Sequence, residues 1–268
     1  MMGLANTFKG MEGYYRKKLS GFTLIELITV IVILSILAVI GSGFVARTAE
    51  SYQRTQTRAL LINTARPSLE RITRQLRVAL PFSLRLTNSN SCIEFIPIVG
   101  AGNYFDPVPD QSNLANPAIT IAASPYEIDS GVARFVSIGA MANAELYGGT
   151  ATSRATFAGY SNGNLNLTLA QRWVRNSINK RYYLLDNPQA FCVVGSELRY
   201  YDGININDAN VTLTNSFSII ARNVTAPTPF ALATGSENRN VAVNILLAFA
   251  SGGESVTYSQ RVLIRNVP

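Results

Sequence analysis

The stretch SGFTLIELITVIVILSILAVIGSGF, residues 20–44, decides how this chain begins. From Leu27 to Ala46 the chain runs for twenty residues without a charged side chain. A helix of that length spans roughly 30 Å, the thickness of a bilayer core. Glu26 stands at the head of this run, and an ionised carboxylate in hydrocarbon costs about 2.5–3.5 kcal/mol. The stretch therefore predicts a membrane helix whose acidic residue needs a neutralising partner.

A cleaved secretory signal is the competing interpretation, because it also joins a basic leader to an apolar segment. The apolar run here is longer than the usual apolar region of about 7–15 residues in such signals. The basic leader also ends in Gly-Phe-Thr-Leu-Ile-Glu instead of running straight into leucines. We therefore expect residues 22–46 to stay as a transmembrane anchor. Basic residues flank both ends of the span, so the positive-inside rule assigns no orientation.

Charge and composition narrow the class of function. The chain has 268 residues, with 23 Lys and Arg against 16 Asp and Glu. The excess is N-terminal: residues 1–21 carry a net charge of +3, residues 47–85 one of +6, and residues 86–268 one of −1. A nucleic-acid-binding globular domain is disfavoured on that distribution. The chain has no histidine, which excludes Ser-His-Asp catalysis and His-ligated metals. We expect no enzyme, no cofactor and no metal, although catalysis by carboxylates or lysine stays open.

The chain has two cysteines, Cys92 and Cys192, and both follow the predicted span. An even number beyond a membrane segment favours an oxidising periplasm and one disulfide. Closing a loop of about 100 residues stabilises by about 4–5 kcal/mol in the chain-entropy model. The alternative is a pair of buried, reduced thiols in a cytosolic domain.

The residues Gly21-Phe22-Thr23-Leu24-Ile25-Glu26, between a basic leader and an apolar helix, resemble the type IV prepilin signature. The family includes type IV pilins, minor pilins and the pseudopilins of type II secretion. The resemblance implies cleavage after Gly21 by a prepilin peptidase, which also methylates the new N-terminus at Phe22. Glu26 would then pair with the Phe22 amine of a neighbouring subunit, which removes most of the cost of a buried charge. A glutamate that snorkels to the lipid headgroups is the alternative.

Beyond residue 47 the pattern stays helical. Apolar residues recur at three- and four-residue steps, at Leu61, Ala65, Leu69, Ile72, Leu76 and Leu80. Pro67 predicts a kink or a new helix start, and Gly41-Ser42-Gly43 predicts local melting or bending. The opposite face carries Arg66, Arg71, Arg74 and Arg77. That face is either a solvated surface or a basic surface that meets acidic patches on neighbouring subunits. Arg47, Arg54 and Arg58 lie closer to the span, where lipid headgroups are a third candidate.

After Pro81 the composition changes to short β-prone runs separated by Gly, Asn, Asp, Ser and Pro. Two-residue turns predict hairpins at Gly195-Ser196 and at Gly252-Gly253. Residues 140–163 are rich in small residues and predict a long surface loop. The predicted fold is α+β and pilin-like, with a long N-terminal transmembrane helix packed on an antiparallel β-sheet domain. The expected parts are a leader (1–21), a transmembrane and assembly segment (22–46), a periplasmic helix half (47–80) and a β-rich globular domain (81–268).

Three segments, residues 69–86, 92–104 and 181–203, resemble the MshO-type minor pilins of the mannose-sensitive haemagglutinin (MSHA) pilus system. This resemblance places Cys92 and Cys192 in matching contexts, and it implies assembly into a pilus with other major and minor pilins. It also implies an inner-membrane precursor with a periplasmic domain, and an eventual place in the pilus at the cell surface. The alternatives are a J-like pseudopilin of type II secretion and a membrane-anchored periplasmic adhesin that does not polymerise. Residues 201–212 offer oxygen ligands for calcium but depart from the EF-hand pattern.

Overall fold

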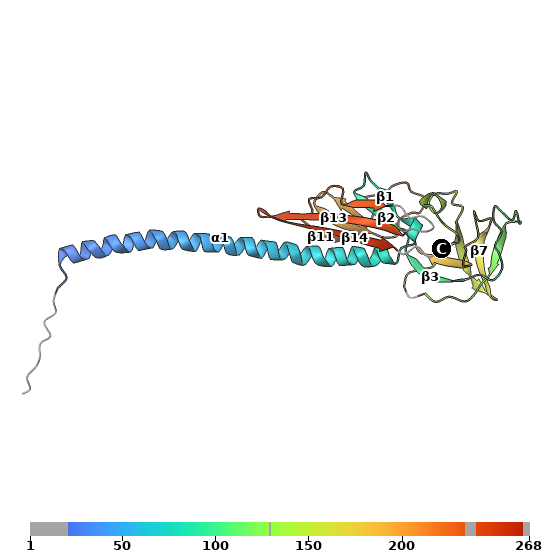
Figure 1. Ribbon diagram of the computed structural model, residues 1–268, viewed down its shortest axis with the longest axis horizontal. Coiled ribbons are helices and arrows are strands. Elements are labelled where there is room, and N and C mark those ends of the chain that lie inside the picture. The colour runs from blue at the N-terminus through green and yellow to red at the C-terminus, as the bar shows by residue number, and fades with distance from the viewer. Residues whose placement is uncertain (1–20, 129, 234–239, 265–268) are drawn as a thin grey trace, which may run out of the picture. The chain divides into compact units, whose positions relative to one another are not determined.

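A computed structural model describes residues 21–128, 130–233 and 240–264. The chain divides into two compact units, Met1–Gln53 and Arg54–Pro268. Helix α1, Leu24–Arg77, runs across the boundary, so its first half belongs to one unit and its second half to the other. The second unit adds antiparallel β-sheets, which makes the architecture α+β (Figure 1).

Helix α1 is continuous through the two places where the sequence predicts a disruption, Gly41-Ser42-Gly43 and Pro67. The prediction of local melting at Gly41-Ser42-Gly43 is wrong, because all three residues are helical. Each glycine costs only about 1 kcal/mol, too little to open a cooperative helix with intact turns on both sides. A new helix start at Pro67 is wrong as well. A proline in a helix costs about 3 kcal/mol, and burial of the flanking residues Ala65 and Leu69 against the sheets offsets that cost.

One stripe of α1 is buried within the second unit. Leu61, Ala65, Leu69, Ile72 and Leu76 are each at most 5% exposed, which confirms these five predicted positions. Leu80 follows the end of the helix and joins a different apolar cluster. The stripe packs against strand residues that include Ile93, Phe95, Phe191, Val243, Ile245, Leu247 and Phe249. Helix and sheets therefore share one hydrophobic core.

Two antiparallel sheets contribute strands to that core. The five-stranded sheet has the order β1-β2-β9-β10-β11, with β1 Arg85–Thr87, β2 Cys92–Phe95, β9 Gln189–Val194, β10 Glu197–Tyr201 and β11 Ser218–Arg222. The three-stranded sheet has the order β12-β13-β14, with β12 Phe230–Ala233, β13 Val241–Ser251 and β14 Glu254–Ile264. Figure 1 shows β13 and β14 running alongside the C-terminal half of α1.

A six-stranded sheet is inserted between β2 and β9. Its order is β3-β8-β5-β6-β7-β4, with β3 Ile98–Asn103, β4 Ala118–Ala122, β5 Phe135–Ser137, β6 Arg154–Ser161, β7 Asn164–Gln171 and β8 Arg181–Leu185. Of two short 3-10 helices, η1 Pro81–Ser83 precedes β1 and η2 Asn143–Glu145 lies between β5 and β6. The inserted sheet has a core of its own, in which Trp173 and Tyr182 are fully buried.

Both predicted hairpins are confirmed. Val194 pairs with Glu197 across Gly195-Ser196, and Ser251 pairs with Glu254 across Gly252-Gly253. Gly252 and Gly253 have φ of 56° and 80°, values that a two-residue turn of this kind needs at both positions. Glycine is required there because other residues adopt that conformation only with strain.

The prediction of a surface loop over residues 140–163 is wrong for its second half. Strand β6 occupies residues 154–161 and pairs with both β5 and β7. The turn to β7 is Asn162-Gly163, with φ of 51° and 76°. An Asn-Gly pair is the strongest short-range signal for a hairpin, so the sequence contained the information. Strand β12 is a further strand without a sequence prediction.

Candidate assembly site

The predicted cleavage point lies just before α1. Gly21 and Phe22 precede the first helical residue, and both are exposed. Phe22 is 82% exposed. A peptide bond in this position is outside the hydrogen-bonded helix, which leaves the Gly21–Phe22 bond open to a peptidase.

Thr23 and Glu26 form the start of the helix. Thr23 Oγ1 accepts a hydrogen bond from the Glu26 backbone N–H at 3.3 Å, which satisfies one of the free donors at a helix start. The carboxylate of Glu26 stands in the first turn, where the helix dipole favours a negative charge. Thr23 has no role in the sequence prediction, although the spacing Thr-x-x-Glu is that of a capping box. Glu26 therefore helps to start the helix.

The apolar half of α1 exposes large side chains on all sides. Examples are Leu24 at 79%, Leu34 at 58%, Val39 at 72% and Phe44 at 72% exposed. Among the described residues, α1 is the helix that is long and apolar enough to cross a membrane. A helix that is apolar all round fits a lipid environment or a bundle of similar helices, rather than one side of a globular core. The segment is thus consistent with a membrane anchor.

Three hydroxyl groups within the apolar half are satisfied by the helix itself. Thr29, Ser35 and Ser42 donate to the carbonyl oxygens three residues earlier, at 2.8–2.9 Å. An unpaired hydroxyl in hydrocarbon costs several kcal/mol, so these internal bonds lower the cost of burying the segment in lipid. Glu26 differs from them, because its carboxylate makes no hydrogen bond to a described residue.

The predicted arginine face separates into two environments in the second unit. The guanidinium of Arg71 lies 5.2 Å from the centroid of the Tyr200 ring, a cation–π contact. Arg66, Arg74 and Arg77 instead line an open groove between α1 and β14, with a volume of about 610 Å³. Thr73 also lines this groove, and its Oγ1 is buried without a hydrogen-bond partner among the described residues. Glu70 also lines the groove, which therefore carries a net positive charge from three arginines and one glutamate.

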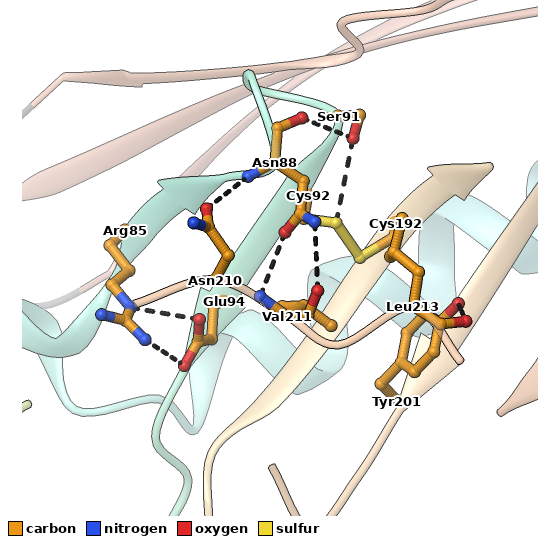
Figure 2. Close-up of a disulfide and its surroundings, with 10 residues drawn as sticks. All are labelled: Arg85, Asn88, Ser91, Cys92, Glu94, Cys192, Tyr201, Asn210, Val211 and Leu213. Atoms are coloured by element: carbon orange, nitrogen blue, oxygen red, sulfur yellow. Dashed lines mark hydrogen bonds and ion pairs between the residues drawn. A yellow bond between two sulfur atoms is a disulfide. The ribbon is translucent and has the colours of Figure 1, made fainter. Parts of the chain in front are cut away.

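Cys92 and Cys192 are direct cross-strand neighbours in β2 and β9, and a disulfide joins them (Figure 2). Both residues are fully buried. Their sequence separation is 100 residues, and the whole six-stranded sheet lies within that loop. The disulfide thus fastens together the two strands from which the inserted sheet leaves and to which it returns.

A buried ion pair lies on the same strand as Cys92. Arg85 in β1 contacts Glu94 in β2 through two hydrogen bonds, of 2.9 and 3.1 Å, and the Glu94 side chain is fully buried (Figure 2). Burial raises the pKa of the Glu94 carboxyl, and the bonds from Arg85 offset only part of that effect. The guanidinium of Arg85 also lies 3.7 Å from the centroid of the Tyr147 ring.

Asn88 connects the strands next to the disulfide with the loop that follows β10. Its side chain donates to the Val211 carbonyl and accepts from the Val211 N–H, at 3.0 and 3.1 Å. Asn210 accepts a hydrogen bond from the Asn88 backbone (Figure 2). Within this loop, Asn205 donates to Asp208 at 3.2 Å. The described residues contain no group of three or more His, Cys, Asp or Glu side chains that could hold a metal ion.

Residues 16–42 match the family model of the prokaryotic N-terminal methylation motif. No curated protein and no solved structure gives a significant match to the chain. The matched segment includes Gly21, Phe22 and Glu26 and the first turns of α1. The motif is type IV pilin-like and implies processing by a prepilin peptidase and pilin assembly. The chain thus begins as a type IV pilin-like precursor does.

Proposed function

We propose that this chain is a minor type IV pilin of the MSHA type. In this proposal the precursor is inserted in the inner membrane, cleaved between Gly21 and Phe22, and N-methylated at Phe22. Residues 22–46 hold it in the membrane, and residues 47–80 and 81–268 lie in the periplasm. The protein then joins other major and minor pilins in or at the tip of a pilus at the cell surface, where it supports biogenesis or adhesion. The observation that carries the proposal is the methylation motif at the head of a long helix whose residues 27–46 carry no charge.

The choice of the MSHA system in this proposal rests on the resemblance of three segments of the sequence. Residues 69–86 form the end of α1, η1 and the start of β1, residues 92–104 form β2 and β3, and residues 181–203 form β8 to β10. Side chains from all three segments, among them Ile72, Phe95 and Phe191, pack in one hydrophobic core. The resemblance therefore covers the parts of the chain that touch one another, together with the disulfide that joins two of them.

The mechanism of assembly rests on Glu26. Its favourable interaction with the helix dipole is about 0.3–1 kcal/mol, less than the cost of about 2.5–3.5 kcal/mol in hydrocarbon. Cleavage after Gly21 creates a positive amine on Phe22, four residues from this carboxylate. In a staggered array of identical helices, the amine of one subunit neutralises Glu26 of the next, which fixes their register. Glu26 is therefore a register residue in the proposal.

The proposal is tested with the variant Glu26→Gln and the matched control Glu70→Gln, an exposed glutamate on the same helix. Removing one partner of a buried ion pair costs about 3–5 kcal/mol. We expect Glu26→Gln to be cleaved normally but to fall by more than about 100-fold in the sheared-pilus fraction. Glu70→Gln is expected at the wild-type level. The readout is an immunoblot of membrane and pilus fractions.

Normal incorporation of Glu26→Gln would contradict the proposed role of Glu26 and favour an anchored adhesin that does not polymerise. The methylation motif is equally compatible with a J-like pseudopilin, so a deletion strain separates these two cases. Loss of surface pili with intact protein secretion supports the pilus. Loss of secretion with intact pili would assign the chain to type II secretion.

A further inference from the structure

Arg154 has an unusual environment for an arginine. It opens strand β6, and its guanidinium lies 4.8 Å from the centroid of the Phe135 ring. Nη2 donates to the Gly148 carbonyl at 2.7 Å, whereas Nε is buried without a hydrogen-bond partner in the described part of the chain. Burial lowers the pKa of this guanidinium, and no carboxylate of a described residue forms an ion pair with it. A positive charge in this state is partly desolvated and has no counter-charge in the part of the chain that the structure describes.

The guanidinium lines an open cavity of about 510 Å³. This volume lies within the range of about 300–1,000 Å³ that small-molecule sites occupy. Five separate segments form the cavity: β5, the loop from η2 to β6, β6, the connection from β8 to β9, and the loop after β10. Polar side chains reach it from three of them, namely Arg154, Thr156, Asn187, Asn205 and Asn207.

Several of these side chains have unused hydrogen-bonding capacity. The amides of Asn187 and Asn207 and the hydroxyl of Thr156 make no hydrogen bond to any described residue. Each amide offers both donors and an acceptor, and the hydroxyl is likewise a donor and an acceptor. Groups of this kind match ligand hydroxyls, which are also donors and acceptors.

Two carboxylates lie close to the lining, and neither of them lines the cavity. Asp186 pairs with Arg134 at 2.9 Å and accepts from the Asn187 backbone. Asp208 accepts a hydrogen bond from Asn205 at 3.2 Å. Arg154 is therefore the charged group that faces the cavity, and it favours an anion.

We propose that this cavity binds a saccharide that carries a carboxylate. The guanidinium group of Arg154 attracts the carboxylate, and Asn187, Asn207 and Thr156 exchange hydrogen bonds with the sugar hydroxyls. The bound anion supplies the missing counter-charge of Arg154. The site lies in the second unit, so binding requires neither cleavage nor assembly and stands apart from the proposed pilin function.

The test measures binding of D-galacturonate to the full-length protein in detergent micelles by ligand-observed NMR and titration calorimetry. D-galactose is the neutral probe of the same shape, and sodium sulfate is the probe for a simple anion. We expect saturable binding of galacturonate, with galactose and sulfate each weaker by about tenfold or more, because a charge-assisted hydrogen bond and the hydroxyl contacts are both needed. Equal binding of galactose, sulfate that binds as tightly, or an absence of saturable galacturonate binding would each overturn the proposal.

Two variants locate the binding. Arg154→Gln removes the charge, and the matched control Arg261→Gln removes an exposed arginine on β14. Asn207→Asp keeps the size of an exposed side chain and adds a repelling charge, so it remains informative if Arg154→Gln does not fold. We expect Arg154→Gln and Asn207→Asp each to lose galacturonate binding by about tenfold or more, with Arg261→Gln unchanged. Wild-type binding by a folded Arg154→Gln or Asn207→Asp protein would place the ligand elsewhere.

Discussion

At the scale of single residues, the environment of each charged group decides how costly its charge is. Glu26 stands exposed in the first helical turn, Glu94 is buried against Arg85, and Arg154 is half-buried without a counter-charge among the described residues. The free-energy cost of each charge depends on whether water or an opposite charge surrounds it, or neither does. Sequence alone shows the residue type and cannot show which of these environments applies.

Asp110 gives a prediction for the pH dependence of stability. Its carboxylate accepts hydrogen bonds from the Ser112 hydroxyl, from the Ser112 and Asn113 backbones, and from the backbone and side chain of Asn176. The bond from the Ser112 hydroxyl is the largest of the effects that hold the pKa of Asp110 well below its usual value of 3.8. The folded state therefore binds fewer protons than the unfolded state, and this stabilisation is lost as the pH falls below about 4.

We expect Asp110→Asn to be about 2 kcal/mol less stable at pH 7, because its amide would face the Asn176 donors. The difference from wild type should shrink as the pH falls from 4 to 2. Denaturant unfolding followed by circular dichroism measures both effects, and Asp106→Asn is the control because Asp106 is exposed. A difference that stays constant down to pH 2 would contradict this account of Asp110.

At the scale of elements, α1 combines two kinds of helix surface. Its first half is apolar all round and exposed, whereas its second half buries one stripe against the sheets. Periodicity predicts the second half well, because apolar residues at three- and four-residue steps indicate a helix with one buried face. The passage of the helix through Pro67 could not be predicted, since it depends on burial against strands that follow later in the chain, among them β2, β9 and β13.

Ile72 tests the packing of this element. It is fully buried, so Ile72→Ala should lower the free energy of unfolding by about 2–5 kcal/mol. Leu60 is 62% exposed on the same helix, and Leu60→Ala should change stability by no more than about 0.5 kcal/mol. Denaturant titration of both variants in detergent gives the comparison. Equal effects of the two substitutions would show that this stripe does not carry the packing.

The turn that follows strand β6, Asn162-Gly163, is a local signal for a hairpin, whereas the strand itself has no clear local pattern. Its residues RATFAGYS lack a strict apolar alternation, and pairing with β5 and β7 on either side makes them a strand. The cavity at Arg154 was beyond sequence prediction for the same reason. Phe135, Arg154, Asn187 and Asn207 are distant in the chain, and the sheet order brings them together. By contrast, Gly21, Phe22 and Glu26 lie within one short motif, so the sequence alone identifies them as candidate site residues.

At the scale of the whole chain, the second unit is organised around an insertion. The strands β2 and β9 are neighbours in one sheet, and the chain between them forms another sheet with its own core. The Cys92–Cys192 disulfide closes the loop that contains this insertion, and it thereby lowers the conformational entropy of the unfolded chain.

We therefore expect reduction, or the double variant Cys92→Ser with Cys192→Ser, to lower the free energy of unfolding by about 4–5 kcal/mol. Denaturant unfolding with and without dithiothreitol measures the effect. The double variant provides the control, because the reductant should not change its stability further. An unchanged midpoint for the reduced wild-type protein would contradict a stabilising role for the disulfide.

The most direct test of the central claim is the N-terminus of the protein in its native host. N-terminal sequencing and intact mass should be taken from a membrane fraction or from sheared pili. The account predicts a chain that starts at Phe22 and carries one additional methyl group. A chain that starts at Met1 or Met2, or that is cut near Ser42 or Ala46, would contradict the pilin assignment.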